Sequence, residues 1–148
     1  MPAKITEFET KSMSMRRVHL MELQAPAEDV ERIMAAVARI DPLAMGTTYD
    51  NNAFQTAPGV ERYRPRDGAA AGKEEAVRER PGVVALFFET SGGQDVAAEI
   101  VEAVYQVHSY QEPVIRITEC LSSRTKGLDD SDNPHRWWNT TGDWKNGA

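Results

Sequence analysis

Apolar residues along this chain recur at two spacings in turn: every two residues, as in a strand, and about every 3.6 residues, as in a helix. This feature restricts the fold more than any other. Residues 16–24 alternate as a β-strand does, and residues 25–40 then carry an apolar stripe at helical spacing. The continuous apolar run Val83–Phe88 predicts a central strand covered on both faces. A second helical stripe follows over residues 94–107, and residues 113–121 alternate again, which predicts a last strand.

The segment between the first helix and the apolar run is the least regular part of the sequence. Within residues 43–80 we expect a strand over residues 49–56, a turn at residues 57–59 and a second short strand over residues 60–64. The rest of this segment is charged and rich in glycine and alanine. Such a composition is typical either of a mobile solvated loop or of a functional one.

The predicted order is therefore strand, helix, irregular hairpin, strand, helix, strand. Two strand-helix-strand units with right-handed crossovers form a four-stranded antiparallel sheet with both helices on one face. This is the ferredoxin-like βαββαβ fold, of the α+β class. It leaves the other face of the sheet bare, and because another subunit often covers such a face, the sequence predicts an oligomer.

The two ends of the chain differ from this central domain, which we place at residues 15–121. Residues 1–14 are polar and are expected to form a flexible lead-in. Residues 122–148 form a polar C-terminal tail that contains all three tryptophans of the chain, Trp137, Trp138 and Trp144. Tryptophan rings seldom stay in water without a partner surface. We therefore expect these rings to pack either on their own chain or on a neighbouring subunit.

Composition excludes several classes of protein. The 148 residues carry a formal net charge of −6 at pH 7, whereas a general nucleic-acid binder normally has a surplus of basic residues. The single cysteine, Cys120, rules out an intramolecular disulfide and favours a reducing compartment. The longest apolar run is too short to span a membrane, and residues 1–11 lack the apolar stretch of a signal peptide. We expect a cytoplasmic protein that binds neither nucleic acid nor membrane.

Three groups of residues resemble a known superfamily. The segment His108-Ser109-Tyr110-Gln111-Glu112-Pro113, between the second helix and the last strand, is similar to a His-x-Tyr-Glu-(x)-Pro turn of the CutA cation-tolerance proteins and of the YqfO-like inserted domain. The upstream residues that resemble the YqfO-like pattern are Tyr49, Phe54, Gly59, Tyr63-Arg64-Pro65 and Gly68-Ala69. Asn133-Pro134 followed by Trp138 is similar to the segment after the last CutA strand. The resemblance covers roughly residues 16–121.

This resemblance implies a PII-like fold in a stand-alone domain and a homotrimer. It implies a non-catalytic regulatory protein that binds a small-molecule effector or an ion at the clefts between subunits, and that signals through the loop of residues 43–80. Two alternatives stay open. One is a CutA-type protein that binds a divalent cation such as copper or zinc. The other is an oligomeric scaffold that uses its tryptophan-containing tail to dock a protein partner.

Five residues are candidates for ligand binding. His108, Tyr110 and Glu112 bring an imidazole, a hydroxyl and a carboxylate to one corner of the fold, although His108 is also suited to fixing the turn or capping the helix. Arg64 belongs to a locally basic loop whose guanidinium groups are suited to a phosphate or carboxylate. Arg116 lies in mid-strand and needs an acidic partner across the sheet or in another subunit.

The sequence gives a weaker indication of a metal site and little of catalysis. A soft-metal site would combine Cys120 with His108, His19 or His135, although no two of these residues stand at ligand spacing. Cys120 is better interpreted as an ordinary small apolar strand residue. No serine has the context of a nucleophile, and the histidines are scattered. We therefore expect that the protein is not an enzyme.

Overall fold

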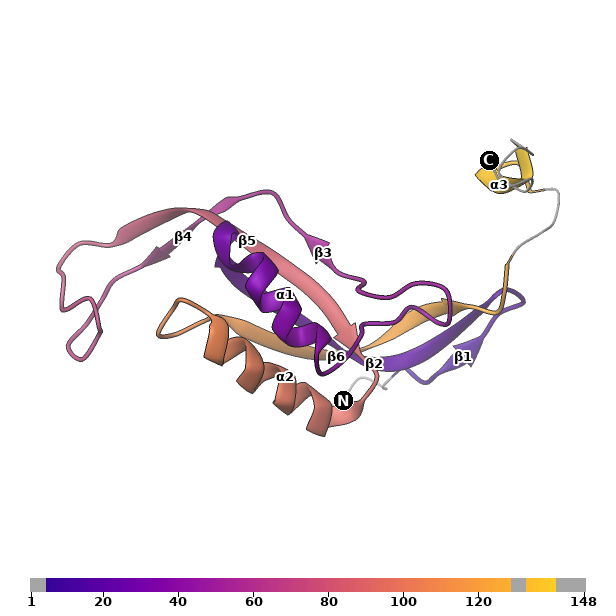
Figure 1. The fold of residues 1–148 in the computed structure, drawn as a ribbon, viewed down its shortest axis with the longest axis horizontal. Coiled ribbons are helices and arrows are strands. Elements are labelled where there is room, and N and C mark those ends of the chain that lie inside the picture. Colours follow the sequence, from indigo (N-terminus) through magenta and orange to yellow (C-terminus); the bar gives the residue numbers. More distant parts are fainter. Residues whose placement is uncertain (1–4, 129–132, 141–148) are drawn as a thin grey trace.

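The computed structural model describes residues 5–128 and 133–140, which form an antiparallel sheet flanked by two long helices (Figure 1). In chain order the elements are β1 (Phe8–Glu9), β2 (Met13–Pro26), the 3₁₀ turn η1 (Ala27–Asp29), α1 (Val30–Ala38), β3 (Phe54–Gln55), β4 (Gly59–Tyr63), β5 (Arg78–Thr90), α2 (Gly93–Val107), β6 (Ile115–Thr125) and α3 (Trp137–Thr140). The α+β class predicted from the sequence is confirmed. Across the described ranges, every helix is too short or too polar to cross a membrane.

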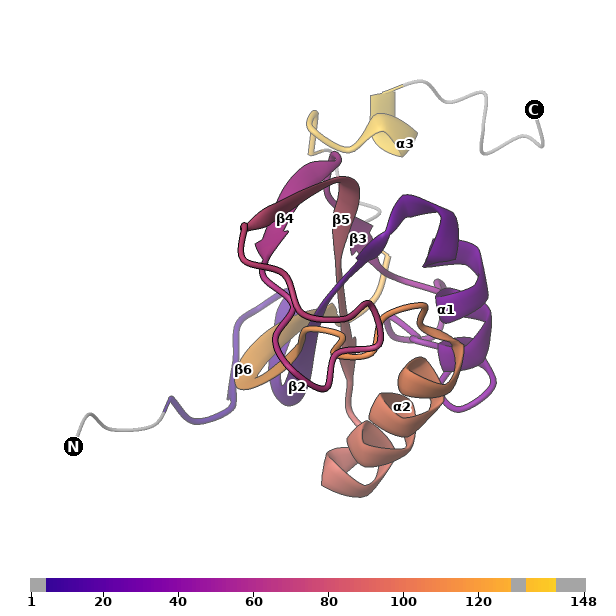
Figure 2. The same ribbon diagram turned by 90° about the vertical axis from the view of Figure 1, so that its left-hand side faces the viewer.

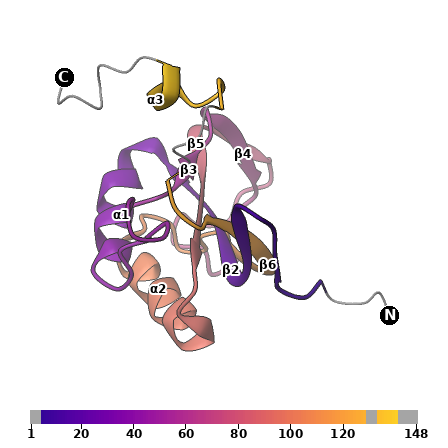
Figure 3. The same cartoon turned by 90° about the vertical axis from the view of Figure 1, so that its right-hand side faces the viewer.

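The centre of the sheet consists of β2 and β5, which pair antiparallel from His19↔Thr90 to Pro26↔Val83. β6 pairs with the other edge of β2, while β3 and β4 share the outer edge of β5. The first and third strands of the predicted βαββαβ unit are therefore central, as in a ferredoxin-like sheet. Helices α1 and α2 lie side by side on one face (Figures 2 and 3).

The hydrophobic core lies between this face and the helices. Met21 and Leu23 of β2 lie opposite Phe88 and Leu86 of β5, and all four side chains are buried. The residues that α1 and α2 bury against them are Ile33, Val37, Ile100 and Val104. Burying each side chain of this kind contributes roughly 1.5–3 kcal/mol. The apolar side chains whose spacing predicted the elements therefore also supply, by their burial, much of the energy that holds the elements together.

The N-terminal end of the sheet extends beyond the predicted strand. β1 pairs with the start of β2, so part of residues 1–14, expected to be a flexible lead-in, belongs to the sheet. Glu9 accepts hydrogen bonds from Ser14 and Lys126 and pairs with Arg16, and these contacts lower the pKa of Glu9 to about 2. Exposed polar contacts leave no hydrophobic period, which is why the sequence did not indicate this extension.

β5 also starts earlier than predicted, because its first half forms an exposed hairpin with β4. Pro81 lies inside the strand opposite Val60, next to a register shift between Gly59 and Val60. Proline has no amide hydrogen to donate, so a sheet tolerates it at such bulges. Gly82 follows with a φ of +77°, a conformation that favours glycine. Pro81 and Gly82 therefore mark a bulge within a continuous strand.

Two more strands differ in length from the prediction. The strand expected over residues 49–56 is reduced to Phe54–Gln55, because a turn closed by a bridge to Tyr49 precedes it. β6 continues past the predicted end of the domain, so residues 122–125 of the expected tail belong to the sheet. Arg124 forms an ion pair of 2.6 Å with Glu89 there.

The described part of the C-terminal tail contains the short helix α3. The rings of Trp137 and Trp138 contact each other edge to face, with centroids 5.8 Å apart, and the guanidinium of Arg136 lies 6.0 Å from the Trp138 ring. The third tryptophan of the predicted tail, Trp144, lies outside the described residues.

Helices α1 and α2 leave the opposite face of the sheet uncovered. We call this surface the open sheet face. Among the residues that strand register places on it are Leu20, Glu22, Phe54, Phe87, Arg116, Thr118 and Cys120. Phe54 and Phe87 contact each other with ring centroids 6.5 Å apart, and Arg116 forms a 2.9 Å ion pair with Glu22. A surface of apolar rings beside paired charges resembles the composition of a subunit interface.

Candidate functional site

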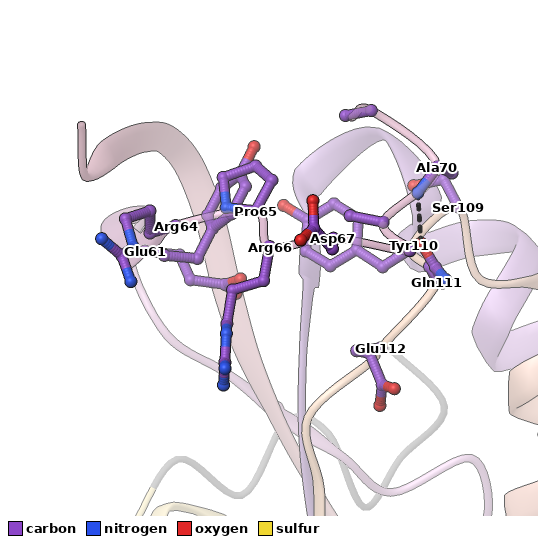
Figure 4. Close-up of a pocket in the computed structure, with 14 residues that line it drawn as sticks. Glu61, Arg64, Pro65, Arg66, Asp67, Ala70, Ser109, Tyr110, Gln111 and Glu112 are labelled. Carbon is purple, nitrogen blue, oxygen red and sulfur yellow. Dashed lines mark hydrogen bonds between the residues drawn. The ribbon is translucent and has the colours of Figure 1, made fainter. Parts of the chain in front are cut away.

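A cleft of about 670 Å³ separates two segments that are distant in the sequence (Figure 4). One is the tip of the β4–β5 hairpin, residues 64–77, which we call the hairpin tip. The other is the turn between α2 and β6, residues 108–114, which we call the 108–114 turn. The lining residues are Glu61, Tyr63, residues 64–71 and residues 109–112. The volume lies in the range of small-molecule sites.

The 108–114 turn is fixed to the sheet by His108, which is 8% exposed. Its Nδ1 accepts a hydrogen bond from the backbone amide of Tyr110 at 3.0 Å, and its Nε2 lies 2.8 Å from the carbonyl oxygen of Gln24. An amide can only donate and a carbonyl can only accept, so the imidazole is neutral and carries its proton on Nε2. Both ring nitrogens are therefore occupied, and His108 fixes the turn.

A buried carboxylate holds the same turn against the helices. Asp29 accepts hydrogen bonds from the amide and the hydroxyl of Ser109, at 3.1 and 2.5 Å, and forms a 2.7 Å ion pair with Arg32. Arg32 in turn donates to the carbonyl oxygen of Val107 at 2.7 Å. Burial alone would raise the pKa of Asp29, but the hydrogen bonds from Ser109 and Arg32 outweigh it and lower the pKa. The turn is therefore held rigidly beside the cleft.

Tyr110 presents its side chain to the cleft (Figure 4). The centroid of its ring lies 5.0 Å from that of the His108 ring. Burial and the negative charge of Glu61 raise the pKa of Tyr110, while Arg80 acts in the opposite direction. Within the described residues, the Tyr110 hydroxyl and Glu61 Oε2 are the buried side-chain polar atoms that have no hydrogen-bond partner. Both residues line the cleft, so each brings an unsatisfied polar atom to it.

The hairpin tip forms the opposite wall. The amide of Ala70 donates a 2.8 Å hydrogen bond to the side-chain oxygen of Gln111, which joins the tip to the turn (Figure 4). Within the tip, Pro65 is buried and its carbonyl accepts a 3.1 Å hydrogen bond from the amide of Glu74. Gly68 turns the chain with a φ of +94°, which favours glycine. These contacts give the tip a defined shape, with most of its side chains in solvent.

Comparison with solved structures shows what this architecture resembles. A Bacillus cereus protein related to NIF3 aligns with a TM-score of 0.60 and 15% identity, over 77% of this chain and 29% of the other. CutA1 from Ehrlichia chaffeensis, a divalent ion tolerance protein, aligns with a TM-score of 0.51 and 16% identity, over 76% of this chain and 85% of the other. The chain has a CutA-like fold. The resemblance to CutA and YqfO-like proteins inferred from the motifs is confirmed for the fold.

The CutA-like fold occurs here at low sequence identity. GlnK from B. subtilis aligns with 11% identity and a TM-score of 0.45, over 71% of this chain and 86% of the other. No protein-family model matches the chain, and no curated protein sequence does. The chain spans less than a third of the NIF3-related protein, with 29% covered.

The structure brings three of the five predicted ligand-binding residues together. Arg64, Tyr110 and Glu112 line the cleft of the CutA-like fold. His108 lies directly beside it but points its ring nitrogens to backbone groups. Arg116 lies elsewhere, on the open sheet face, where its acidic partner is the residue opposite it in the ladder.

Sequence reasoning missed Glu61, Asp67 and Gln111 as lining residues. The alternation of β4 is the signal that could have found Glu61, because it places Glu61 on the same face as Tyr63. Gln111 lies inside the motif that was singled out, yet its contact with Ala70 depends on how the hairpin folds back. No local pattern encodes that contact.

The candidate metal ligands lie apart. Across residues 5–128 and 133–140, no three His, Cys, Asp or Glu side chains come together in a way that could hold a metal ion, so Cys120, His108 and His135 do not form one site. Cys120 lies on the open sheet face, where burial and the nearby Glu89 raise the pKa of its thiol. His135 lies in the C-terminal segment just ahead of α3.

Proposed function

We propose that this protein is a non-catalytic regulator that binds a small ligand in the cleft between the hairpin tip and the 108–114 turn. The observation that carries the proposal is the cleft itself. It joins two segments distant in the sequence, and it has a rigid wall and a lightly held one. Asp29 and His108 fix the turn, whereas the bond between Ala70 and Gln111 holds the hairpin tip.

The contrast between the two walls supports a signalling role for the hairpin tip. A ligand that contacts both walls binds more tightly when the hairpin tip lies close to the 108–114 turn. It therefore shifts the protein toward that arrangement. Ordering of a surface segment by a ligand is a common way to change the surface that a partner protein binds. In this proposal the hairpin tip changes its position when the ligand binds, and the 108–114 turn stays in place.

The proposed assembly is a homotrimer. Two observations support it: the open sheet face has the composition of an interface, and the motifs resemble those of the trimeric PII-like proteins. In such an assembly the open sheet faces meet one another, because the helices already cover the other side of each sheet. The clefts then lie at the periphery or between neighbouring subunits.

Native mass spectrometry of the purified protein tests this proposal. We expect a trimer that carries additional small-molecule mass, either as isolated or after incubation with a small-molecule extract of the expression host. Ala70→Trp, which fills the cleft and keeps the backbone amide, should abolish the added mass. Val77→Trp is the matched control, because Val77 lies on the same hairpin tip but does not line the cleft.

The outcomes separate the parts of the proposal. A monomer contradicts the assembly, and a trimer that acquires no mass contradicts ligand binding. Added mass equal to copper or zinc instead supports a CutA-type cation-binding function. The E. chaffeensis protein is named a divalent ion tolerance protein.

A further inference from the structure

The charged side chains of the hairpin fall into two groups. Those that do not line the cleft are paired: Arg62 with Glu79 at 4.0 Å, Lys73 with Glu75 at 3.7 Å, Arg78 with Glu74, and Arg80 with Glu28 at 2.9 Å. Five charged residues line the cleft, and within the described residues none of their charged groups has an ion-pair or hydrogen-bond partner: Glu61, Arg64, Arg66, Asp67 and Glu112. The unpaired charges are therefore concentrated in the cleft.

The cleft contains a buried acceptor that requires a hydrogen-bond donor. Glu61 Oε2 is buried and unpartnered, and so is the hydroxyl of Tyr110. A buried carboxylate oxygen without a donor costs free energy that a matching N–H group recovers. A ligand ammonium, guanidinium or amide satisfies this acceptor.

The cleft also contains donors that require an acceptor. Arg64 and Arg66 present two guanidinium groups from the hairpin tip, and guanidinium binds carboxylate or phosphate through paired hydrogen bonds. Asp67 and Glu112 also line the cleft and carry negative charge (Figure 4). Counted over the five lining residues, three carboxylates face two guanidinium groups, so the cleft disfavours a multiply charged anion such as a nucleotide.

From this charge pattern we infer that the ligand of the cleft is a small dipolar molecule. It carries an ammonium or guanidinium group that pairs with Glu61 and one carboxylate or phosphate group that pairs with Arg64 and Arg66. Its apolar body lies against Tyr63, Pro65 and the alanines of the hairpin tip. This inference rests on the proposed function, because it names the chemical class of the ligand at the same site.

Two matched sets of small molecules test the inference by NMR titration of the full-length protein. The first set is 5-aminovalerate, pentylamine and valerate, and the second is phosphoethanolamine, ethanolamine and ethyl phosphate. In each set the first member is dipolar and the others keep one charge only. We expect the dipolar member of at least one set to bind at least tenfold more tightly than both of its single-charge counterparts.

Three variants assign the charges to their residues. Glu61→Gln should reduce the affinity of the dipolar probe to that of the anionic counterpart, and Arg64→Gln should reduce it to that of the cationic one. Arg62→Gln is the matched control, since Arg62 is exposed, paired with Glu79 and outside the cleft. It should leave the affinity unchanged.

Each other outcome overturns the inference. An anion that binds as tightly as the dipolar probe makes the cleft an anion site, and a cation that does so makes it a cation site. Equal losses in Arg62→Gln and Arg64→Gln show long-range electrostatics instead of recognition. If neither set binds, the dipolar class is wrong. The proposed function survives that result if native mass spectrometry still finds a ligand that Ala70→Trp excludes.

Discussion

At the scale of single residues, His108 holds two backbone groups, the amide of Tyr110 and the carbonyl of Gln24. We expect His108→Ala to lower the free energy of unfolding by roughly 2–3 kcal/mol, because both groups lose a partner in a buried place. Urea denaturation measures this. His19→Ala is the control, because His19 is only half-buried and its side chain makes no hydrogen bond among the described residues. Equal losses for the two variants would contradict the assigned role.

Asp29 adds a contribution that depends on pH. Its pKa is lowered from an ordinary value of 3.8. A carboxyl of this kind stabilises the fold above its ordinary pKa and loses that contribution as the pH falls through the lower folded-state pKa. We expect Asp29→Asn to cost roughly 1–3 kcal/mol at pH 7. The difference from the unchanged protein should shrink below about pH 4, and a difference that stays constant with pH argues against this account.

Tyr110 should show opposite effects on stability and binding. Its buried hydroxyl has no partner, so Tyr110→Phe removes a desolvation cost and should leave the free energy of unfolding unchanged or raise it by up to about 1 kcal/mol. The same variant should weaken binding of the dipolar probe by roughly tenfold, because a hydrogen bond to the ligand is lost. Thermal denaturation and NMR titration measure the two effects, and a variant that loses both stability and affinity is evidence for a structural role.

At the scale of elements, the bond between Ala70 and Gln111 decides how closely the hairpin tip approaches the turn. Gln111→Ala removes the acceptor, so the amide hydrogen of Ala70 should exchange with solvent at least several-fold faster. Hydrogen exchange followed by NMR measures this rate. Gln111→Glu is the control, because it keeps an acceptor oxygen at the same position. Unchanged exchange in Gln111→Ala would show that other contacts hold the tip.

The same scale explains which elements the sequence could predict. Both helices and the centres of β2, β5 and β6 bury one face, so their hydrophobic periods are visible in the sequence. β1 and the first half of β5 are held by exposed ion pairs and backbone pairing, which leave no such period. The sequence at the bulge, Pro81 and Gly82, also resembled the end of a strand, because proline and glycine usually occur where a strand begins or ends.

The site was predictable in part for a related reason. Tyr110 and Glu112 lie in one short turn, and Arg64 lies in a recognisable motif, so local sequence was enough to single them out. Glu61 became part of the site only because β4 pairs with β5 and faces the turn. That placement depends on contacts between segments nearly 50 residues apart, which a reading of local patterns does not reach.

At the scale of the whole molecule, the open sheet face is the surface proposed to hold the trimer together. Thr118 lies in this face and is exposed in the single chain. Thr118→Arg should therefore leave the fold intact while it places an unpaired charge in the interface and dissociates the trimer. Sedimentation velocity measures the assembly, and circular dichroism checks the fold. Glu102→Arg on α2 is the exposed control, and a trimer that survives Thr118→Arg would place the interface elsewhere.

The hairpin tip contributes almost nothing to the hydrophobic core, since nearly all of residues 64–77 are exposed. Substitutions and short insertions at such a place cost little folding energy. Recognition and folding are thus governed by separate stretches of the chain. Proteins that share this scaffold are free to diverge in what they bind, and residues 64–77 can be exchanged by design to give the scaffold a new ligand.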